Sequence, residues 1–321
     1  MIRVGIVGGA GFTAGELLRI LLNHPEVEIC FIHSKSHAGQ PISKVHTDLI
    51  GESELVFSED ITLRIDVMFL CTGHGQSEIF LKENAVPGKL KIIDLSQDFR
   101  IQSENHDFVY GLPELNRHAI KVAERIANPG CFATCIQLGL LPLSSYGLIK
   151  STIHIQGITG STGAGQKPLP TTHFSWRNNN VSVYKAFNHQ HLAEIKQSIR
   201  QLQPDFNQDL LFIPIRGNFT RGILCAMYTK CTVDFEEIKS LYDSYYNSNP
   251  FVVVAEYNPD VKQVVNTNKG LVYLEKHGEY LLVVSAIDNL LKGASGQAVQ
   301  NMNIAFGLEE QTGLKLKATA F

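Results

Sequence analysis

The feature that most constrains the fold is a glycine-rich turn near the start of the chain. Residues 2–7 form an apolar, β-rich run that leads into Gly9-x-Gly11-x-x-Ala14, and the apolar side chains of residues 14–22 recur at helical spacing. A strand, a glycine-rich turn and an amphipathic helix in this order are typical of the first βα unit of a dinucleotide-binding fold. The glycines let a pyrophosphate approach the free N–H groups at the helix start. A tight turn that binds no ligand is the alternative.

The second predicted strand, residues 27–32, indicates which dinucleotide binds. Many NAD enzymes place an Asp or Glu after this strand, where the carboxylate binds the ribose 2′-hydroxyl. Here the strand runs into His33-Ser34-Lys35-Ser36, and two hydroxyls with a cation suit a 2′-phosphate. The sequence therefore predicts NADP. The residues expected to bind it are Gly8, Gly9, Ala10, Gly11, Phe12, Thr13, Ser34, Lys35 and, after a further strand at 67–71, Thr72.

The hydrophobic pattern divides the chain into two domains. In the first part, short apolar runs alternate with helical patterns, which indicates a parallel sheet covered by helices. After about residue 151 the strand-like runs are longer and closer together, which predicts a largely antiparallel sheet. The fold class is therefore α/β, with a Rossmann-type dinucleotide-binding domain at 1–130, completed by a helical segment within 293–321, and a second, α+β domain at 131–292. Further strands are expected at 90–95, 125–127, 152–159, 211–215, 222–233, 251–256, 271–275 and 280–287, and helices at 190–202, 235–246 and 293–306.

Composition limits the partners and the compartment. The 321 residues are 44% hydrophobic and carry a net charge of -3, so there is no excess of cations for a nucleic acid or an anionic membrane. The start of the chain has neither the layout of a signal peptide nor an apolar stretch of transmembrane length, which predicts a cytoplasmic protein. Six cysteines in such a protein are expected to be reduced thiols rather than a disulfide framework.

One cysteine differs from the other five in its setting. Asn128-Pro129-Gly130-Cys131 precedes an apolar helical pattern over residues 132–141, so the Pro-Gly pair turns the chain and leaves Cys131 at a helix N-terminus. The positive end of the helix dipole favours a thiolate there, and the free N–H groups stabilise an oxyanion on an attached acyl group. Cys131 is therefore the candidate nucleophile.

A series of motifs makes the chain similar to a known family. The motifs are Asp94-Leu95-Ser96, Asp98-Phe99-Arg100, Tyr110-Gly111-Leu112-Pro113-Glu114, Gly160-Ser161-Thr162-Gly163-Ala164-Gly165, His189-x-His191-x-x-Glu194 and Asp288-Asn289-Leu290-Leu291-Lys292-Gly293. Together with residues 8–15 and 128–131, their order and spacing resemble the N-acetyl-γ-glutamyl-phosphate reductase family of arginine biosynthesis, nearly from end to end. One departure is Phe132-Ala133, where the family often has Tyr-Pro.

The resemblance implies a thioester mechanism with a histidine as acid and base. Cys131 attacks an acyl phosphate, phosphate leaves, NADPH supplies a hydride, and an imidazole moves the proton. His189 and His191 are both candidates, because they open a predicted helix in which Glu194 can orient one imidazole. Two positions apart they point in different directions, so both stay open. Metal ligation by His-x-His is the rival interpretation, but apart from Glu194 no further ligand is close in sequence, and no metal is expected.

The implied substrate carries a phosphate and a carboxylate, so cations are expected at the site. The alternative for any single arginine is a solvated surface charge that binds no substrate. The turn at 160–165 is either a phosphate-binding nest or a flexible loop. Asn289 is expected near the nicotinamide, or else it holds the last helix on the first domain. The candidates for substrate binding are Arg100, Arg216, Arg221, Ser161 and Gly163.

Three function classes remain in view. The first is the N-acyl-γ-glutamyl-phosphate reductase, with an acetyl or a succinyl group on the substrate nitrogen. The second is a related phosphorylating enzyme such as an aspartate-semialdehyde dehydrogenase, and the third is a non-enzymatic NADP-sensing protein with an unreactive Cys131. The resemblance also implies that residues 131–292 form the catalytic and dimerisation domain of a homodimer or a homotetramer that takes a small-molecule acyl phosphate. The net charge argues against a nucleic-acid or membrane partner.

Overall fold

The computed structural model describes residues 1–319, and the chain divides into two compact units. The first unit comprises Met1–Pro129 and Ala294–Lys315. The second unit comprises Gly130–Gly293 and, at the end of the described chain, residues 316–319. The nucleophile candidate Cys131 is therefore the second residue of the second unit.

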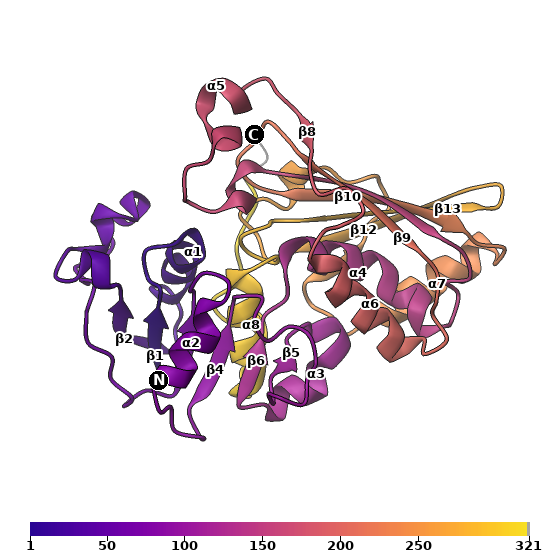
Figure 1. Cartoon of the computed structure of the whole chain (residues 1–321). Helices are drawn as coiled ribbons and strands as arrows, with labels where there is room; N and C mark the ends of the chain where they lie inside the picture. The colour runs from indigo at the N-terminus through magenta and orange to yellow at the C-terminus, as the bar shows by residue number, and fades with distance from the viewer. Residues whose placement is uncertain (320–321) are drawn as a thin grey trace. The chain divides into compact units, whose positions relative to one another are not determined.

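The first unit is built on a six-stranded, wholly parallel sheet in the order β2-β1-β3-β4-β6-β5 (Figure 1). The predicted parallel sheet is confirmed, and its predicted strands and first helix agree with the structure to within two residues at each end. The short strand β5 and the helices α2 and α3 were not predicted. The elements are β1 (Ile2–Val7), α1 (Phe12–Leu21), β2 (Val27–His33), β3 (Val67–Leu70), α2 (Gln76–Glu83), β4 (Lys91–Asp94), β5 (Val109–Tyr110), α3 (Pro113–Val122), β6 (Arg125–Ala127) and α8 (Ser295–Ala305).

Helix α8, which follows residues 130–293 of the second unit in sequence, packs against α1, α3 and β4. Its buried face is rich in amides, and two of them make hydrogen bonds to other parts of the unit. Asn301 Nδ2 donates to Gly111 O at 2.8 Å and to Asn128 Oδ1 at 3.1 Å, and Asn303 Oδ1 lies 3.1 Å from His24 Nε2. Because a buried amide is costly without partners, these bonds specify one position for α8 in the first unit.

The second unit contains a seven-stranded mixed sheet in the order β11-β12-β13-β10-β7-β9-β8 (Figure 1). Four of its pairings are antiparallel and two, β11 with β12 and β7 with β9, are parallel, so the predicted largely antiparallel sheet is confirmed. The elements are α4 (Cys131–Ser145), β7 (Ile153–Thr159), α5 (Phe174–Arg177), β8 (Ser182–Val183), α6 (His191–Leu202), β9 (Leu210–Arg216), β10 (Ile223–Lys230), α7 (Phe235–Tyr246), β11 (Val252–Val254), β12 (Gly270–His277) and β13 (Tyr280–Ile287).

Helix α4 forms the centre of this unit, and every residue from its second to its fourteenth is buried. It contacts β10, β13, α6 and α7. Pro142 lies inside the helix and has no N–H, so the carbonyl of Leu138 loses its helical donor. The hydroxyl of Tyr246 donates to Leu138 O instead, and that of Tyr242 donates to Gly139 O at 2.6 Å. The two tyrosines of α7 thus complete the backbone hydrogen bonding of a helix that is buried on all sides.

None of the helices in residues 1–319 combines the length and the apolar character that a membrane crossing requires.

Candidate active site

The glycine-rich turn of the first unit has the geometry of a dinucleotide site. Gly8 has φ +81°, and a Cβ there would lie 2.6 Å from the carbonyl oxygen of Cys71, so only glycine fits. Gly11 is the N-cap of α1 and makes no side-chain capping bond. The N–H groups of the first turn of α1 are therefore not used by a capping side chain, and they suit an anion.

A polar cluster lies at the carboxyl end of β2, where ligands bind in open parallel sheets. Ser34 is buried, and its Oγ lies 3.3 Å from His37 Nδ1. Ser36 Oγ lies 2.9 Å from the same nitrogen, and Lys35 between them is exposed. The structure therefore adds His37 to the predicted Ser34 and Lys35. Its signal in the sequence was its position three residues after Ser34, at the end of a tight turn over Lys35–His37.

Thr72, the last predicted cofactor residue of the first unit, belongs to a buried hydrogen-bond chain. Its Oγ1 lies 2.7 Å from Ser77 Oγ, which donates to Asp94 Oδ1 at 2.5 Å. Burial raises the pKa of Asp94, although hydrogen bonds from Ser77 and Ser96 and the charge of Arg100 oppose this. The chain joins the ends of β3 and β4 at the edge of the sheet where the polar cluster after β2 also lies.

The Asp98-Phe99-Arg100 motif contacts three parts of the first unit. Asp98 accepts hydrogen bonds from the N–H groups of Gly75, Ser77 and Glu78 and so caps α2. Phe99 stacks on Phe108 with ring centroids 4.1 Å apart. Arg100 is buried and donates from Nε to Asn128 O and from Nη2 to Leu95 O, each at 2.9 Å. At least two of the guanidinium donors of Arg100 therefore bind backbone carbonyls.

Cys131 is the first residue of α4 and is partly exposed, whereas the next thirteen residues of that helix are buried. Its N-cap, Gly130, is extended and has no side chain to compete for the N–H groups of the first turn. Gly293 packs directly against it, because a Cβ on Gly293 would lie 2.8 Å from Cys131 Cβ. The predicted helix-N-terminal position of the thiol is confirmed.

Glu194 connects the segment before the nucleophile to the histidine pair. Its Oε2 accepts a hydrogen bond from Gly130 N at 2.9 Å, and its Oε1 lies 3.9 Å from His191 Nε2. Glu194 and His191 are both buried. His191 N donates to His189 Nδ1 at 3.3 Å, and the two imidazole rings meet edge to face at 4.6 Å. The structure thus brings Glu194, His191 and His189 together around the start of α4.

His189 is enclosed by aromatic rings. Phe132, Tyr184 and Phe212 each meet its imidazole edge to face, with ring centroids 5.4 to 5.9 Å apart. Burial, assisted by the nearby positive groups led by His191, lowers the pKa of His189 to about 3. The imidazole is therefore neutral at pH 7. Phe132, which departs from the family's usual Tyr, provides one wall of this enclosure.

Among residues 1–319 the structure contains no group of three or more His, Cys, Asp or Glu side chains placed to hold a metal ion.

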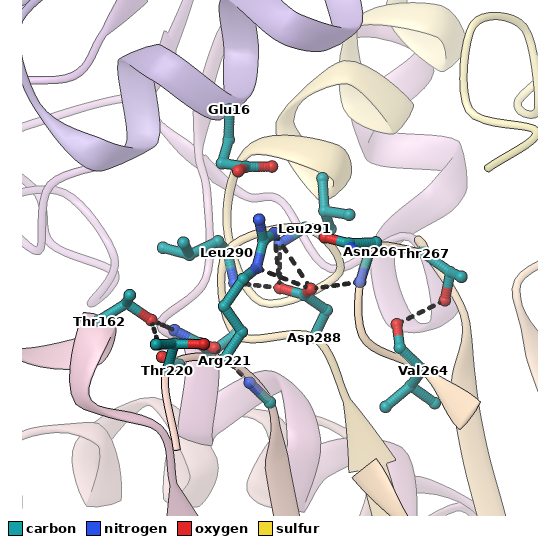
Figure 2. A network of polar contacts seen from close by, with 12 residues as sticks. Glu16, Thr162, Thr220, Arg221, Val264, Asn266, Thr267, Asp288, Leu290 and Leu291 are labelled. Atoms are coloured by element: carbon teal, nitrogen blue, oxygen red, sulfur yellow. Dashed lines mark hydrogen bonds and ion pairs between the residues drawn. The ribbon is translucent and has the colours of Figure 1, made fainter. Parts of the chain in front are cut away.

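Arg221 is paired with a buried carboxylate (Figure 2). Its Nε and Nη2 each donate to Asp288 at 3.1 Å, and Asp288 also accepts from the N–H groups of Asn266, Leu290 and Leu291. Asp288 is 0% exposed. The pair joins the turn before β10 to the end of β13, which gives Arg221 a structural partner.

Asn289 and the turn after β7 belong to the same network. Asn289 Oδ1 accepts from Gly222 N at 2.7 Å, and its Nδ2 donates to Thr162 Oγ1 at 3.0 Å. Thr162 Oγ1 in turn donates to Thr220 O at 2.6 Å. The neighbouring Ser161 donates its N–H to Phe219 O at 2.8 Å. Within the second unit the predicted phosphate turn is thus held by the β9–β10 connection, and Gly163 at its tip is exposed.

Two family models match the chain, one in each unit. The semialdehyde dehydrogenase NAD-binding domain matches residues 3–123, and the semialdehyde dehydrogenase dimerisation domain matches residues 131–289. An N-acetyl-gamma-glutamyl-phosphate reductase from Phocaeicola vulgatus is 59% identical over 322 positions, and one from Flavobacterium johnsoniae is 55% identical over 325, in both cases with 100% of either chain covered. The chain belongs to the N-acetyl-gamma-glutamyl-phosphate reductase family. The resemblance inferred from the motifs is confirmed.

The fold of this reductase family member is shared with aspartate semialdehyde dehydrogenases. Aspartate semialdehyde dehydrogenase II from Vibrio cholerae, solved with ASA, has a TM-score of 0.74 at 16% identity and covers 96% of this chain and 98% of its own. The enzyme from Candida albicans, solved with NADP, has a TM-score of 0.73 at 14% identity, with 96% and 99% covered. At this identity the likeness shows the fold, which confirms the predicted fold class.

Arg216 is the predicted cation that lies beside the histidines of this family member. Its guanidinium carbon is 4.7 Å from the centroid of the Tyr184 ring, and that ring is 5.9 Å from the ring of His189. Burial, with the negative charge of Cys131 next in weight, raises the pKa of Tyr184 to about 12. Tyr184 was not predicted as a site residue; it is one of ten tyrosines, and only its contacts distinguish it.

Proposed function

We propose that this chain reduces an N-acyl-γ-glutamyl phosphate to the N-acylglutamate semialdehyde and phosphate, with NADPH as reductant, in arginine biosynthesis. One observation carries the proposal. Cys131 is a partly exposed thiol on the first residue of a buried helix, and Glu194 links the residue before it to His191. Full-length relatives at 55–59% identity carry the name of this reductase.

The chemistry begins with the Cys131 thiolate. Its sulfur attacks the γ-carbonyl carbon, the bond from that carbon to the phosphate oxygen breaks, and phosphate leaves with the bonding electrons, so that a thioester remains. The N–H groups at the start of α4 stabilise the negative charge on the carbonyl oxygen. NADPH, when bound, supplies the hydride that reduces the thioester carbon. The carbon–sulfur bond then breaks, and the aldehyde is released.

The first unit fits an NADP cofactor. The uncapped start of α1 at Gly11 is suited to the pyrophosphate, and Ser34, Lys35, Ser36 and His37 supply hydroxyls and positive charge for a 2′-phosphate. The match to an NAD-binding domain over this unit supports the assignment.

We assign the acid–base role to His191 rather than His189. His189 has a pKa of about 3 and its Nδ1 already accepts a hydrogen bond from the backbone of His191, so it stays neutral and fixed. His191 lies 3.9 Å from Glu194, whose negative charge favours a protonated imidazole. In this role His191 takes the proton from Cys131 Sγ and returns it when the thiolate leaves the product.

The test follows NADP reduction in the reverse direction, with phosphate and the semialdehydes of N-acetylglutamate, N-succinylglutamate and aspartate. Phosphate-dependent turnover of an N-acylglutamate semialdehyde is expected, and Cys131→Ser should abolish it. Cys135→Ser, one turn further along α4, is the matched control, because Cys135 is buried and donates to Ser285 O, which a hydroxyl can also do. Turnover of aspartate semialdehyde alone would refute the substrate assignment, and NADP binding without any turnover would favour a nucleotide-sensing protein.

A second experiment separates the two histidines. His191→Asn should lower kcat by about 100-fold or more and remove the ionisation that limits the rate on the acid side. His189→Asn should retain that ionisation. The same pH profile for both variants would refute the assignment of His191.

We further propose that the protein is a cytoplasmic homodimer or homotetramer. The match of the second unit to a dimerisation domain supports an assembly, and light scattering at working concentration tests it. A monomer mass would contradict it.

A further inference from the structure

The segment between β7 and α6 contains two elements of the second unit that the sequence did not predict. It carries α5 and the short strand β8, which pairs with the end of β9 so that Ser182 lies opposite Arg216. Three of its residues, Asn179, Lys185 and Phe187, have φ between +45° and +59°, a backbone conformation that costs energy for non-glycine residues. Strained backbone persists only where surrounding contacts hold it, so this segment is held in a definite shape.

Asn218 attaches α5 to the β9–β10 turn. With its amide oriented to satisfy both neighbours, the nitrogen donates to Arg177 O at 3.2 Å and the oxygen accepts from Asn179 N at 2.9 Å. Asn218 is two residues beyond Arg216. The backbone of Arg177, the last residue of α5, is thereby held close to the end of β9.

The side chain of Arg177 is buried with most of its donors unused. Its exposed fraction is 6%, and its Nε and Nη1 have no hydrogen-bond partner among the described residues. Only Nη2 donates, to Asn180 O at 2.9 Å, while the guanidinium packs on the Trp176 ring at 4.9 Å. Arg221 in the same unit shows the usual solution for such a group, an ion pair with Asp288. A buried guanidinium with free donors is costly unless an anion completes its bonding.

Arg216 is a second cation in the part of the unit that contains Arg177. Burial, followed by the like charge of Arg216, lowers the pKa of Arg177, which indicates that the two positive charges interact. Arg216 is partly buried and lies over the Tyr184 ring, which also contacts His189. Two guanidinium groups in one part of the fold, next to the histidine pair, suit a bound anion.

We propose that Arg177 and Arg216 together bind a carboxylate of the substrate, an inference that rests on the proposed function. A carboxylate fits better than the phosphate. The phosphate is attached through oxygen to the carbon that Cys131 attacks, so it must lie at the start of α4. Arg216 instead packs on the Tyr184 ring, which in turn contacts His189. An N-acylglutamyl group has its α-carboxylate several bonds away from the reacting carbon, and an N-succinyl group has a second carboxylate further out. Either presents the two oxygens that a pair of guanidinium forks recognises.

Reverse-direction kinetics test the site, because phosphate and semialdehyde are then separate substrates. Arg177→Lys and Arg216→Lys should each raise KM for the semialdehyde by about 10- to 100-fold, the loss expected for charge-assisted hydrogen bonds, while KM for phosphate changes by less than about 3-fold. Lys150→Ala, which removes an exposed cation of the same unit, should change neither. A rise in KM for phosphate instead, or no change in either constant, would overturn the inference. If the wild-type protein turns over neither N-acylglutamate semialdehyde, the proposed function itself has failed.

Trp176 provides a readout that does not depend on turnover or on the reactive thiol. It is the only tryptophan of the chain, and Arg177 packs on its ring. Titration with N-acetylglutamine, which keeps the α-carboxylate and lacks a reactive γ-group, should change the Trp176 emission in the wild type, and Arg177→Lys should weaken the apparent affinity about 10-fold or more. The α-amide of N-acetylglutamate should have no effect.

N-Succinylglutamine distinguishes the two carboxylates. If it and N-acetylglutamine act alike, the arginine pair holds the α-carboxylate; if it alone changes the emission, the pair holds the carboxylate of the acyl group. An equal response of the wild type and Arg177→Lys to both compounds would overturn the site, as would a response to inorganic phosphate at lower concentration than to either.

Discussion

Replacing Asp288 by asparagine should destabilise the second unit strongly. Both carboxylate oxygens of Asp288 accept hydrogen bonds, and the substitution replaces one of these acceptors by an NH2 group, which donates. Oδ1 accepts from Leu290 N at 2.8 Å, Leu291 N at 3.1 Å and Arg221 Nη2 at 3.1 Å, and an amide oxygen can keep these bonds. Oδ2 accepts from Asn266 N at 2.7 Å and Arg221 Nε at 3.1 Å, and an amide nitrogen there would face two donors.

The magnitude follows from the burial of the pair. The side chain of Asp288 is 0% exposed and that of Arg221 16%, so Asp288→Asn would leave the arginine charge without its buried partner. Breaking such a pair costs about 3–5 kcal/mol. Two buried donors left unsatisfied at about 1–3 kcal/mol each give a similar range. For a unit of this size the unfolding midpoint should fall by roughly 6–20 °C.

Trp176 fluorescence during thermal unfolding is the assay, since the tryptophan belongs to the second unit. Glu279→Gln is the matched control: its carboxylate lies 2.9 Å from Lys230 Nζ, closer than the buried pair, but both side chains are about half exposed. No measurable shift is expected for it, because solvent screens such a pair. If Asp288→Asn shifts the midpoint no more than Glu279→Gln, the reasoning from burial and hydrogen bonding is refuted.

Three further outcomes are expected. Tyr246→Phe should cost about 1–3 kcal/mol in urea unfolding, because the buried carbonyl of Leu138 would lose its donor; a cost near zero would contradict this. Since the folded pKa of His189, about 3, lies below its usual value near 6.5, the unfolded chain binds the additional proton between these values. The contribution of His189 to the free energy of unfolding is therefore fully present above about pH 6.5 and is lost as the pH falls toward 3. His189→Phe should reduce the pH dependence of the urea unfolding midpoint between these two values. Ser34→Ala combined with Lys35→Ala should raise KM for NADPH at least about 10-fold and leave KM for NADH nearly unchanged; equal effects would refute a 2′-phosphate site there.

The regular elements were predictable where the pattern is local. The strand at 2–7, its glycine turn and α1 follow from residues adjacent in sequence, as does the helix that begins at Cys131 after a Pro-Gly pair. The segment around α5 and β8 was not predictable, because its side chains are mostly exposed and follow neither helical nor strand periodicity. Its shape comes from contacts with β9 and with Asn218, which lies far later in the chain.

The sequence by itself determined the family, and it predicted Cys131 as the nucleophile and the glycine-rich turn as the cofactor site. These depend on short runs in which neighbouring residues decide the geometry, such as a glycine that alone permits the turn at Gly8 or a helix start at Cys131. Only the tertiary structure decided what each arginine does. Arg221 meets Asp288 across 67 residues of chain, whereas Arg177 is buried with free donors close to Arg216. Arg177, Arg216 and Arg221 have the same charge and residue type. They differ in the partners that folding brings within hydrogen-bond distance, and this difference distinguishes the structural ion pair of Arg221 from the proposed site for a substrate anion.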